Sequence, residues 1–469
     1  MLIVFSIMLI VVLGFIGLAL DVGQVIGRKT ELQNLADNAA LAAAPELVGT
    51  AAGLANAVSK AKSSAAGQTL YRRRMQGAIL SDDSIRFASA PDAPDNAWHA
   101  AGAVPDPAKA LFVRVDTHNN TPALGQVATA FLGAWSPALR TLDTRGRAVA
   151  GHRSLRITPL AICALSPAPA SLRTNPGPPE RREALEFGFR RGVAYNLFNL
   201  NPHGAAPEHF VLNPLGAPGA IGSPVEVDAA SVEQFICTGS VLHTAIGSTA
   251  IHVHRPFPTA LWGAFNARFN QYADSRCNRI TAPPDTNVRV FPNTASNWWM
   301  NMPSGSNAVA TSGAPLLTVA DLPPVATGLP TNIAPASYGP LWSFAKAVEY
   351  ADPKPPGDYS AFATTAWTGL YPGLPGAPAS NSSYPPSGTP YLATAFQTPP
   401  AGNAGVAQRR VLHIPLLACP LPAGSDVLAT VLGIGRFFMT APATGSVLSG
   451  EFAGVAAEQA LAGPAELFQ

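Results

Sequence analysis

The residues of this sequence best suited to chemistry are two histidines that a strand would hold on one face. His252 and His254 are separated by one residue, a spacing at which both imidazoles of a strand point to the same side and can bind a metal ion. A zinc site needs three or four ligands, and no third ligand is evident here. We therefore interpret the pair as ordinary strand residues and expect no metal and no cofactor.

Catalytic motifs do not accompany these histidines. The sequence contains no Gly-x-Ser-x-Gly elbow, Walker A loop, Gly-x-Gly-x-x-Gly, His-Glu-x-x-His or EF-hand loop. The charged segment from Glu180 to Glu186 (ERREALE) is expected to form a solvated helical turn. We predict that the protein is not an enzyme. The net charge of +2 also gives no electrostatic reason to expect a nucleic-acid partner.

Four cysteines are a second set of reactive residues, and their even number is typical of disulfides in exported proteins. A bond between Cys237 and Cys277 would close a loop of about 41 residues, worth about 4 kcal/mol in the chain-entropy model. Cys163 and Cys419 lie in two similar phrases, ITPLAICALSP and IPLLACPLPAG, which we interpret as equivalent strand ends in two sub-domains. We expect the pairs 237–277 and 163–419; free buried cysteines are the alternative.

The apolar N-terminal run is predicted to form a helix that anchors the rest of the chain to a membrane. From Leu2 to Leu20 only Ser6 is polar, and at about 1.5 Å per residue this run nearly crosses a hydrocarbon core of about 30 Å. A secretory signal would have a charged start and a shorter apolar core, and Ala42-Ala43-Ala44 lies far beyond the core for a cleavage site. We predict a retained transmembrane anchor over 1–27, with a cleaved signal or a buried soluble helix as alternatives.

Past the apolar run, an alanine-rich helix is predicted to continue into water, forming a pilin-like helical stalk over 28–76. Pro45 is expected to end or kink the first helix, and a second helix is expected from Leu54 to about Met75. The apolar stripe of the first helix repeats at helical spacing at Leu32, Leu35, Ala36, Ala39, Ala40 and Ala43.

The remaining chain is predicted to be rich in short strands, which makes the fold class α+β. We expect a small α+β domain over 77–168, with a short helix within 122–132, and a second β-rich domain over 176–469. A Pro/Gly/Ser-rich insertion at about 296–405 is predicted to be loop-like and ordered where its tryptophans dock. These tryptophans are Trp298, Trp299, Trp342 and Trp367. The composition, with 12% charged residues, 41 glycines and 46 prolines, agrees with an extended exported protein.

The segment from Gly17 to Ala44, GLALDVGQVIGRKTELQNLADNAALAAA, resembles the N-terminal signature of TadG-like proteins of the Flp (tight adherence) pilus assembly system, within the TadE/TadG-like family. In that signature an apolar span runs into an Asp-Val-Gly turn, a basic patch, Leu-Gln-Asn, an aspartate and an alanine run. The matching anchor and motif residues are Leu2, Phe15, Gly17, Leu20, Asp21, Val22, Gly23, Arg28, Lys29, Leu32, Gln33, Asn34, Asp37, Ala39 and Ala40.

The resemblance implies a non-catalytic accessory or structural component of pilus assembly, held by a single pass in the bacterial inner membrane with its C-terminal body in the periplasm. It implies membrane lipid and other Tad assembly proteins or pilin as partners, and it leaves homo-oligomerisation open. A bare positive-inside count favours the opposite orientation, because Arg28 and Lys29 follow the span.

Many TadG proteins carry a von Willebrand A domain, whose metal site needs Asp-x-Ser-x-Ser. The segments that begin at Asp82 and Asp358 come closest, and each lacks the second serine, so we infer no such site. The alternative function is a cell-surface adhesin or ligand-binding envelope protein that uses the insertion as its contact.

Overall fold

The computed structural model describes residues 2–70, 75–76, 80–119, 124–152, 154–175, 177, 179–214, 229–243, 245–246, 250–291, 308–310, 316–318, 340–355, 357–371, 384–385 and 387–468. The fold is α+β, with a long N-terminal helix followed by a β-rich body. The chain divides into two compact units, which are described separately: unit 1 comprises Met1–Ser154 with Ala462–Gln469, and unit 2 comprises Leu155–Leu461.

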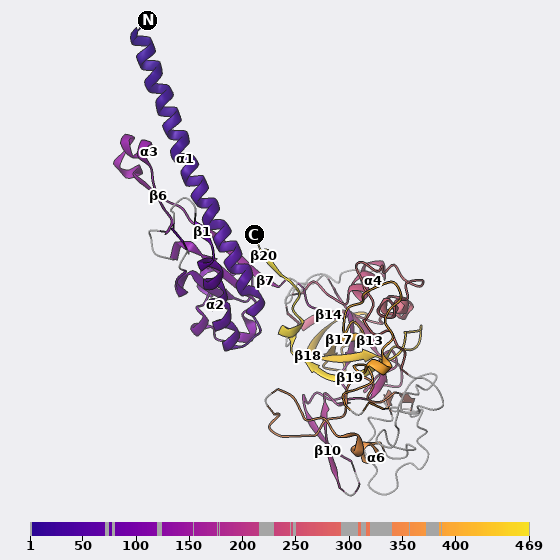
Figure 1. Ribbon diagram of the computed structural model, residues 1–469. Coiled ribbons are helices and arrows are strands. Elements are labelled where there is room, and N and C mark those ends of the chain that lie inside the picture. The colour runs from indigo at the N-terminus through magenta and orange to yellow at the C-terminus, as the bar shows by residue number, and fades with distance from the viewer. Residues whose placement is uncertain are drawn as a thin grey trace. The chain divides into compact units, whose positions relative to one another are not determined.

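The first element of unit 1 is α1, Leu2–Ala43, an uninterrupted helix of 42 residues. Its N-terminal part extends beyond the other elements of the unit (Figure 1). Within the described residues, one helical segment, Val11–Glu46, is long and apolar enough to cross a membrane. The predicted passage from an apolar run into an alanine-rich helix is confirmed, because the sequence between Leu2 and Ala43 contains no proline that would remove a helical hydrogen bond.

A second helix, α2, Ala51–Ala66, folds back along α1 after a turn at Pro45. The Thr50 side chain caps its first turn by accepting a hydrogen bond from the Gly53 amide at 3.0 Å. The helix ends at Ala66 before Gly67, earlier than the expected end near Met75, and a short hairpin of β1 (Thr69–Leu70) and β2 (Met75–Gln76) follows. Residues 71–74 of that expectation lie outside the described part of the chain.

A four-stranded antiparallel sheet completes the core of unit 1, with its strands in the order β20-β7-β4-β3. Their bounds are β3, Ile85–Ala88; β4, Phe112–Asp116; β7, Arg147–His152; and β20, Ala465–Phe468. One face buries apolar side chains such as Ile85, Val113 and Ala150 in a single cluster with those of α1 and α2. The last strand of the chain thus belongs to unit 1, although the expected domain boundaries place it in the second domain.

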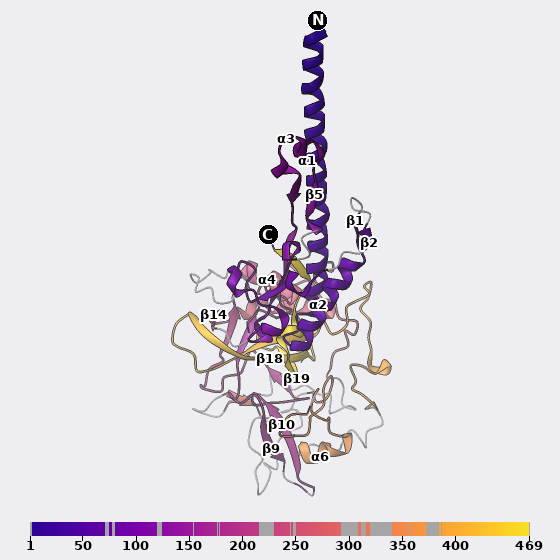
Figure 2. The same ribbon diagram turned by 90° about the vertical axis from the view of Figure 1, so that its left-hand side faces the viewer.

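A narrow hairpin extends from this sheet along α1. Its strands, β5 (Gln126–Ala128) and β6 (Thr141–Asp143), are joined by the six-residue helix α3 (Ala130–Trp135) and a turn of 3₁₀ helix (Pro137–Leu139). The short helix expected within 122–132 is therefore displaced towards the C-terminus. Both views draw α3 beside α1 (Figures 1 and 2).

Unit 2 is built on a seven-stranded sheet in the order β12-β19-β18-β14-β13-β8-β17, in which the long strand β18 also pairs with β17. Five strands from β18 to β17 therefore close into a ring, and in it only the β8–β17 pair is parallel. The bounds are β8, Leu160–Cys163; β12, Ala194–Asn196; β13, His209–Leu212; β14, Ala250–His254; β17, Val411–Leu417; β18, Asp426–Met439; and β19, Ser449–Ala456.

Unit 2 also contains smaller elements. They are the three-stranded sheet of β9 (Ser171–Asn175), β10 (Arg181–Glu186) and β11 (Phe189–Arg190), the pair β15 (Ala308–Ala310) and β16 (Leu316–Thr318), and the helices α4 (Ala229–Thr238), α5 (Trp262–Phe265) and α6 (Trp367–Leu370). In the predicted insertion, Trp342 and Trp367 are fully buried in the main core, whereas Trp298 and Trp299 lie outside the described residues.

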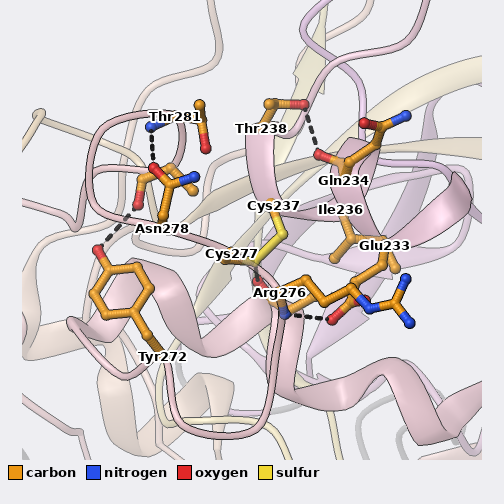
Figure 3. Close-up of a disulfide and its surroundings, with 12 residues drawn as sticks. Glu233, Gln234, Ile236, Cys237, Thr238, Tyr272, Arg276, Cys277, Asn278 and Thr281 are labelled. Carbon is orange, nitrogen blue, oxygen red and sulfur yellow. Dashed lines mark hydrogen bonds and ion pairs between the residues drawn. A yellow bond between two sulfur atoms is a disulfide. The ribbon is translucent and has the colours of Figure 1, made fainter. Parts of the chain in front are cut away.

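Two disulfides join parts of unit 2. Cys237 at the end of α4 is bonded to Cys277, and beside this bond the Arg276 amide donates to a Glu233 oxygen at 2.8 Å (Figure 3). The second bond joins Cys163 to Cys419. The two similar cysteine phrases do not mark two sub-domains, because β8 and β17 are neighbours in one sheet, with Cys163 opposite Leu417.

Candidate functional site

One face of α1 is covered by protein over most of its length. Its buried positions recur every three, four or seven residues, with two adjacent pairs, so they lie on a single stripe of the helix. The stripe comprises Gly17, Asp21, Arg28, Leu32, Leu35, Ala36, Ala39, Ala40 and Ala43. Before Gly17 every described side chain of the helix is exposed, and nearly all are apolar.

Asp21 is the most constrained polar residue of this stripe, with only 1% of its surface exposed. Its carboxylate accepts hydrogen bonds from three successive backbone amides, those of Ala130, Phe131 and Leu132, at 3.1, 2.8 and 2.7 Å. These amides begin α3 and have no partner inside that helix. The carboxylate of the anchor helix therefore caps a helix more than one hundred residues away in the sequence.

Gly17, one turn before Asp21, lets the hairpin approach α1 closely. A Cβ atom at this position would lie 2.2 Å from Cδ1 of Phe131, a distance that real contacts do not reach. The Phe131 ring thus occupies the space that any side chain at Gly17 would need. Gly23, on the exposed side of α1, has no atom within 4 Å of such a Cβ.

Arg28 and Gln33 continue the contact towards the sheet. Arg28 is buried, and its Nε and Nη2 donate to the Leu124 carbonyl at 3.0 and 2.5 Å. The Gln33 side chain donates to the Arg147 carbonyl at 2.9 Å and accepts from the Arg147 amide at 3.2 Å. It also donates to Asp37 at 2.7 Å. Three polar residues of the signature thus hold the hairpin and β7 against α1.

The other predicted site residues fall into two groups. Leu32, Ala39 and Ala40 are buried between α1 and the rest of unit 1. Exposed positions are Phe15, Leu20, Val22, Gly23 and Asn34, and the side chain of Leu2 lies outside the described part. Sequence reasoning missed the partners at Leu124, 130–132 and Arg147. The single signal that pointed to them was an aspartate placed directly after an apolar run.

The histidine pair and the charged segment both lie in strands of unit 2. His252 and His254 lie on β14, and His254 bonds Asp426 at 3.0 Å; among the described residues no group of three metal-ligating side chains occurs. The segment 180–186 is not a solvated helical turn, because its residues from Arg181 to Glu186 form β10. Its Glu183 and Glu186 are buried and bonded to Arg190 at 2.9 Å and Arg191 at 2.5 Å.

A fully buried carboxylate, Glu451 on β19, was also missed. It accepts hydrogen bonds from the backbone amides of Ser343, Phe344 and Ala345 at 2.7, 2.9 and 2.7 Å. Burial raises the pKa of Glu451 to about 7, against the opposing effect of these hydrogen bonds. It fixes a loop on the sheet.

The apolar helix and its covered stripe are compatible with a single-pass membrane anchor that carries a folded body. Residues 1–46 match the family described as putative Flp pilus-assembly TadE/G-like. The N-terminal segment is thus similar to TadE/G-like pilus-assembly proteins, and the resemblance seen in the sequence is confirmed. No curated protein and no solved structure matches this chain.

Proposed function

We propose that the protein is a membrane-anchored accessory or structural component of Flp (tight adherence) pilus assembly and acts without catalysis. The observation that carries the proposal is that a TadE/G-like segment forms one continuous helix, apolar and exposed at its start and covered by the body further on. Such a helix can fix a folded body at a constant distance from the bilayer. Its partners would be membrane lipid, other Tad assembly proteins or pilin, and a second copy of the chain.

The body is proposed to lie in the periplasm and α1 in the inner membrane. Two disulfides favour an oxidising compartment over the cytoplasm. The basic residues that argue for the opposite orientation carry little weight, because Arg28 is buried and bonded to Leu124 and long C-terminal domains are translocated largely regardless of charge.

A structural role is supported by the way the buried charges of unit 2 are used. Glu183, Glu186 and Glu451 each bond a guanidinium or backbone amides. These contacts hold strands and loops of unit 2 together. The adhesin alternative has less support, since Trp342 and Trp367 of the insertion are buried and cannot contact a ligand.

The proposal is tested by deleting the gene and complementing it with three forms of the full-length protein. The native chain is expected to stay with the membrane in an alkaline carbonate wash and to restore pili. A form whose residues 2–20 are replaced by a cleaved secretory signal should become soluble and fail to restore pili. The matched control, with residues 2–16 replaced by a leucine helix of equal length, keeps the anchor and the Gly17 contact and should restore them.

Two results would contradict the proposal. Normal pili in the deletion strain would remove the role in assembly, and normal pili with the soluble form would remove the need for anchoring.

A further inference from the structure

We propose that the tip of the hairpin, residues 130–139, is a second membrane-contacting element that lies in the lipid leaflet nearest the body, beside α1. The inference rests on the proposed function, because it requires that α1 spans a bilayer. The kind of partner is the acyl chains of membrane lipid.

The composition of the tip is the first observation. Its ten residues, AFLGAWSPAL, contain no charge, and charged residues return at Arg140 and Asp143. Three large apolar side chains remain exposed to different degrees: Trp135 is 89% exposed, Phe131 50% and Leu139 37%. Single exposed apolar residues are common on soluble proteins, but a cluster of this kind marks an interaction surface. Tryptophan is also enriched at the membrane interface.

The level of the tip along α1 is the second observation. Tip and helix enclose an apolar groove of about 810 Å³. Its lining includes Val11, Phe15 and Leu18 of α1 and Phe131, Trp135 and Leu139 of the tip. If the run from Leu2 to Leu20 spans the bilayer, its midpoint is near position 11. The remaining nine residues of helix rise about 14 Å, which is about half the thickness of the hydrocarbon core. Positions 11–18 therefore lie in the half of the bilayer nearest the body. The groove is continuous with the exposed apolar surface of α1, so lipid chains are its natural occupants.

The hydrogen bonding of the tip is the third observation. Backbone groups in a lipid environment must be satisfied within the protein, because no water replaces the missing partner. The Asp21 carboxylate satisfies the first three amides of α3. Around the base, Thr129 Oγ1 donates to the Leu139 carbonyl, and the Thr129 amide donates to the Arg140 carbonyl at 3.0 Å. Pro137 has no amide hydrogen to satisfy.

The test places an environment-sensitive fluorophore on single added cysteines of the full-length protein, since the four native cysteines form disulfides. The labelled variants are Trp135→Cys in the tip, Phe15→Cys on α1 as the anchor reference and Ile280→Cys on unit 2 as the matched control, 93% exposed. Each is reconstituted into liposomes of phosphatidylethanolamine and phosphatidylglycerol that contain lipids spin-labelled along the acyl chain.

We expect quenching at position 135 to approach that at position 15 and to exceed that at position 280 several-fold. Quenching at 15 with none at 135 would overturn the inference while leaving the anchor intact, and cross-linking of position 135 to another protein helix would then identify a protein partner instead. Absence of quenching at 15 would contradict the anchor itself, so the two failures are distinguishable. Asp21→Ala is also added to the two labelled variants. It should lower the quenching at position 135 in the Trp135→Cys variant and leave the quenching at position 15 unchanged in the Phe15→Cys variant.

Discussion

Asp21 and Glu451 use the same chemistry in two different regions of the molecule. Each is a buried carboxylate that accepts hydrogen bonds from three successive backbone amides, at 130–132 for Asp21 and 343–345 for Glu451. Glu451 lies on a central sheet and is enclosed by the core of unit 2. Asp21 lies on the anchor helix and caps the six-residue helix α3. The apolar side chains of the hairpin tip that contains α3 are exposed.

The difference shows that a buried carboxylate bonded to three backbone amides can fix either a loop of a hydrophobic core or a hairpin that projects from one. The loop fixed by Glu451 carries Trp342 into the main core, so loss of the carboxylate disturbs packing throughout unit 2. The tip of the hairpin fixed by Asp21 packs on α1, so loss of that carboxylate should release the tip and little else.

The largest effect is expected from Glu451→Ala. It leaves three buried amides without acceptors and a cavity in the core, and we expect unit 2 to lose about 4 kcal/mol of its free energy of unfolding. Hydrogen exchange of the full chain, read on peptides of unit 2, measures the loss. Glu180→Ala, at an exposed position, is the matched control and should change nothing. Equal protection in both variants would show that Glu451 does not hold the loop.

A pH dependence separates the two carboxylates further. The pKa of Glu451 is raised from 4.5 to about 7 in the folded state, so the folded protein binds this proton more tightly than the unfolded chain. Between about pH 4.5 and 7 its contribution to stability is therefore lost as the pH rises, by about 3 kcal/mol. We expect this slope in the difference between the native chain and Glu451→Gln, measured by chemical denaturation.

The comparison with Glu451→Gln is needed because a half-buried histidine, His413, titrates in nearly the same pH range and affects stability with the opposite sign. Burial lowers the pKa of His413 to about 4, so its contribution to stability is lost as the pH falls. The variant retains His413, and the difference therefore isolates Glu451. A flat difference across this window would contradict the raised pKa.

A smaller and local effect is expected from Asp21→Ala. The tip should lose about 2 kcal/mol of its local stability, because three amides lose their acceptor while the rest of α1 keeps its contacts. Chymotrypsin should then cleave faster after Phe131, Leu132 and Trp135 in detergent-solubilised protein, with unit 2 as stable as before. Asp21→Asn keeps one acceptor oxygen, so its cleavage rate should lie between those of the native chain and Asp21→Ala. A global loss of stability would refute the view that the tip is an appendage.

Much of this organisation follows from local sequence patterns. The apolar run and the alanine stripe predict α1 because helical spacing is a property of neighbouring residues. The partners of Asp21 lie 109 to 111 residues away, so no local pattern indicates them. The expectation of a helical turn over 180–186 is wrong for a different reason, because Glu183 and Glu186 bond Arg190 and Arg191, seven and five residues further on, across a local hairpin that the charge pattern alone does not distinguish from a helix. Likewise, nothing in β20 indicates that it pairs with β7.

The smallest effect is expected from Gly17→Ala. The added methyl would meet the Phe131 ring, and because that ring can shift with the tip we expect a cost of about 1 kcal/mol, seen as faster chymotrypsin cleavage of the tip. Gly23→Ala is the matched control on the same helix, where the methyl meets nothing. Equal cleavage in the two variants would mean that Phe131 does not pack on α1.

The central claim is that α1 remains in the inner membrane with the body on its outer side. It is tested most directly by labelling Ile280→Cys in the full-length protein with a membrane-impermeant thiol reagent, since this position is almost fully exposed. The account predicts complete labelling in intact spheroplasts and no further labelling after lysis. Labelling that requires lysis would place the body in the cytoplasm and contradict the account.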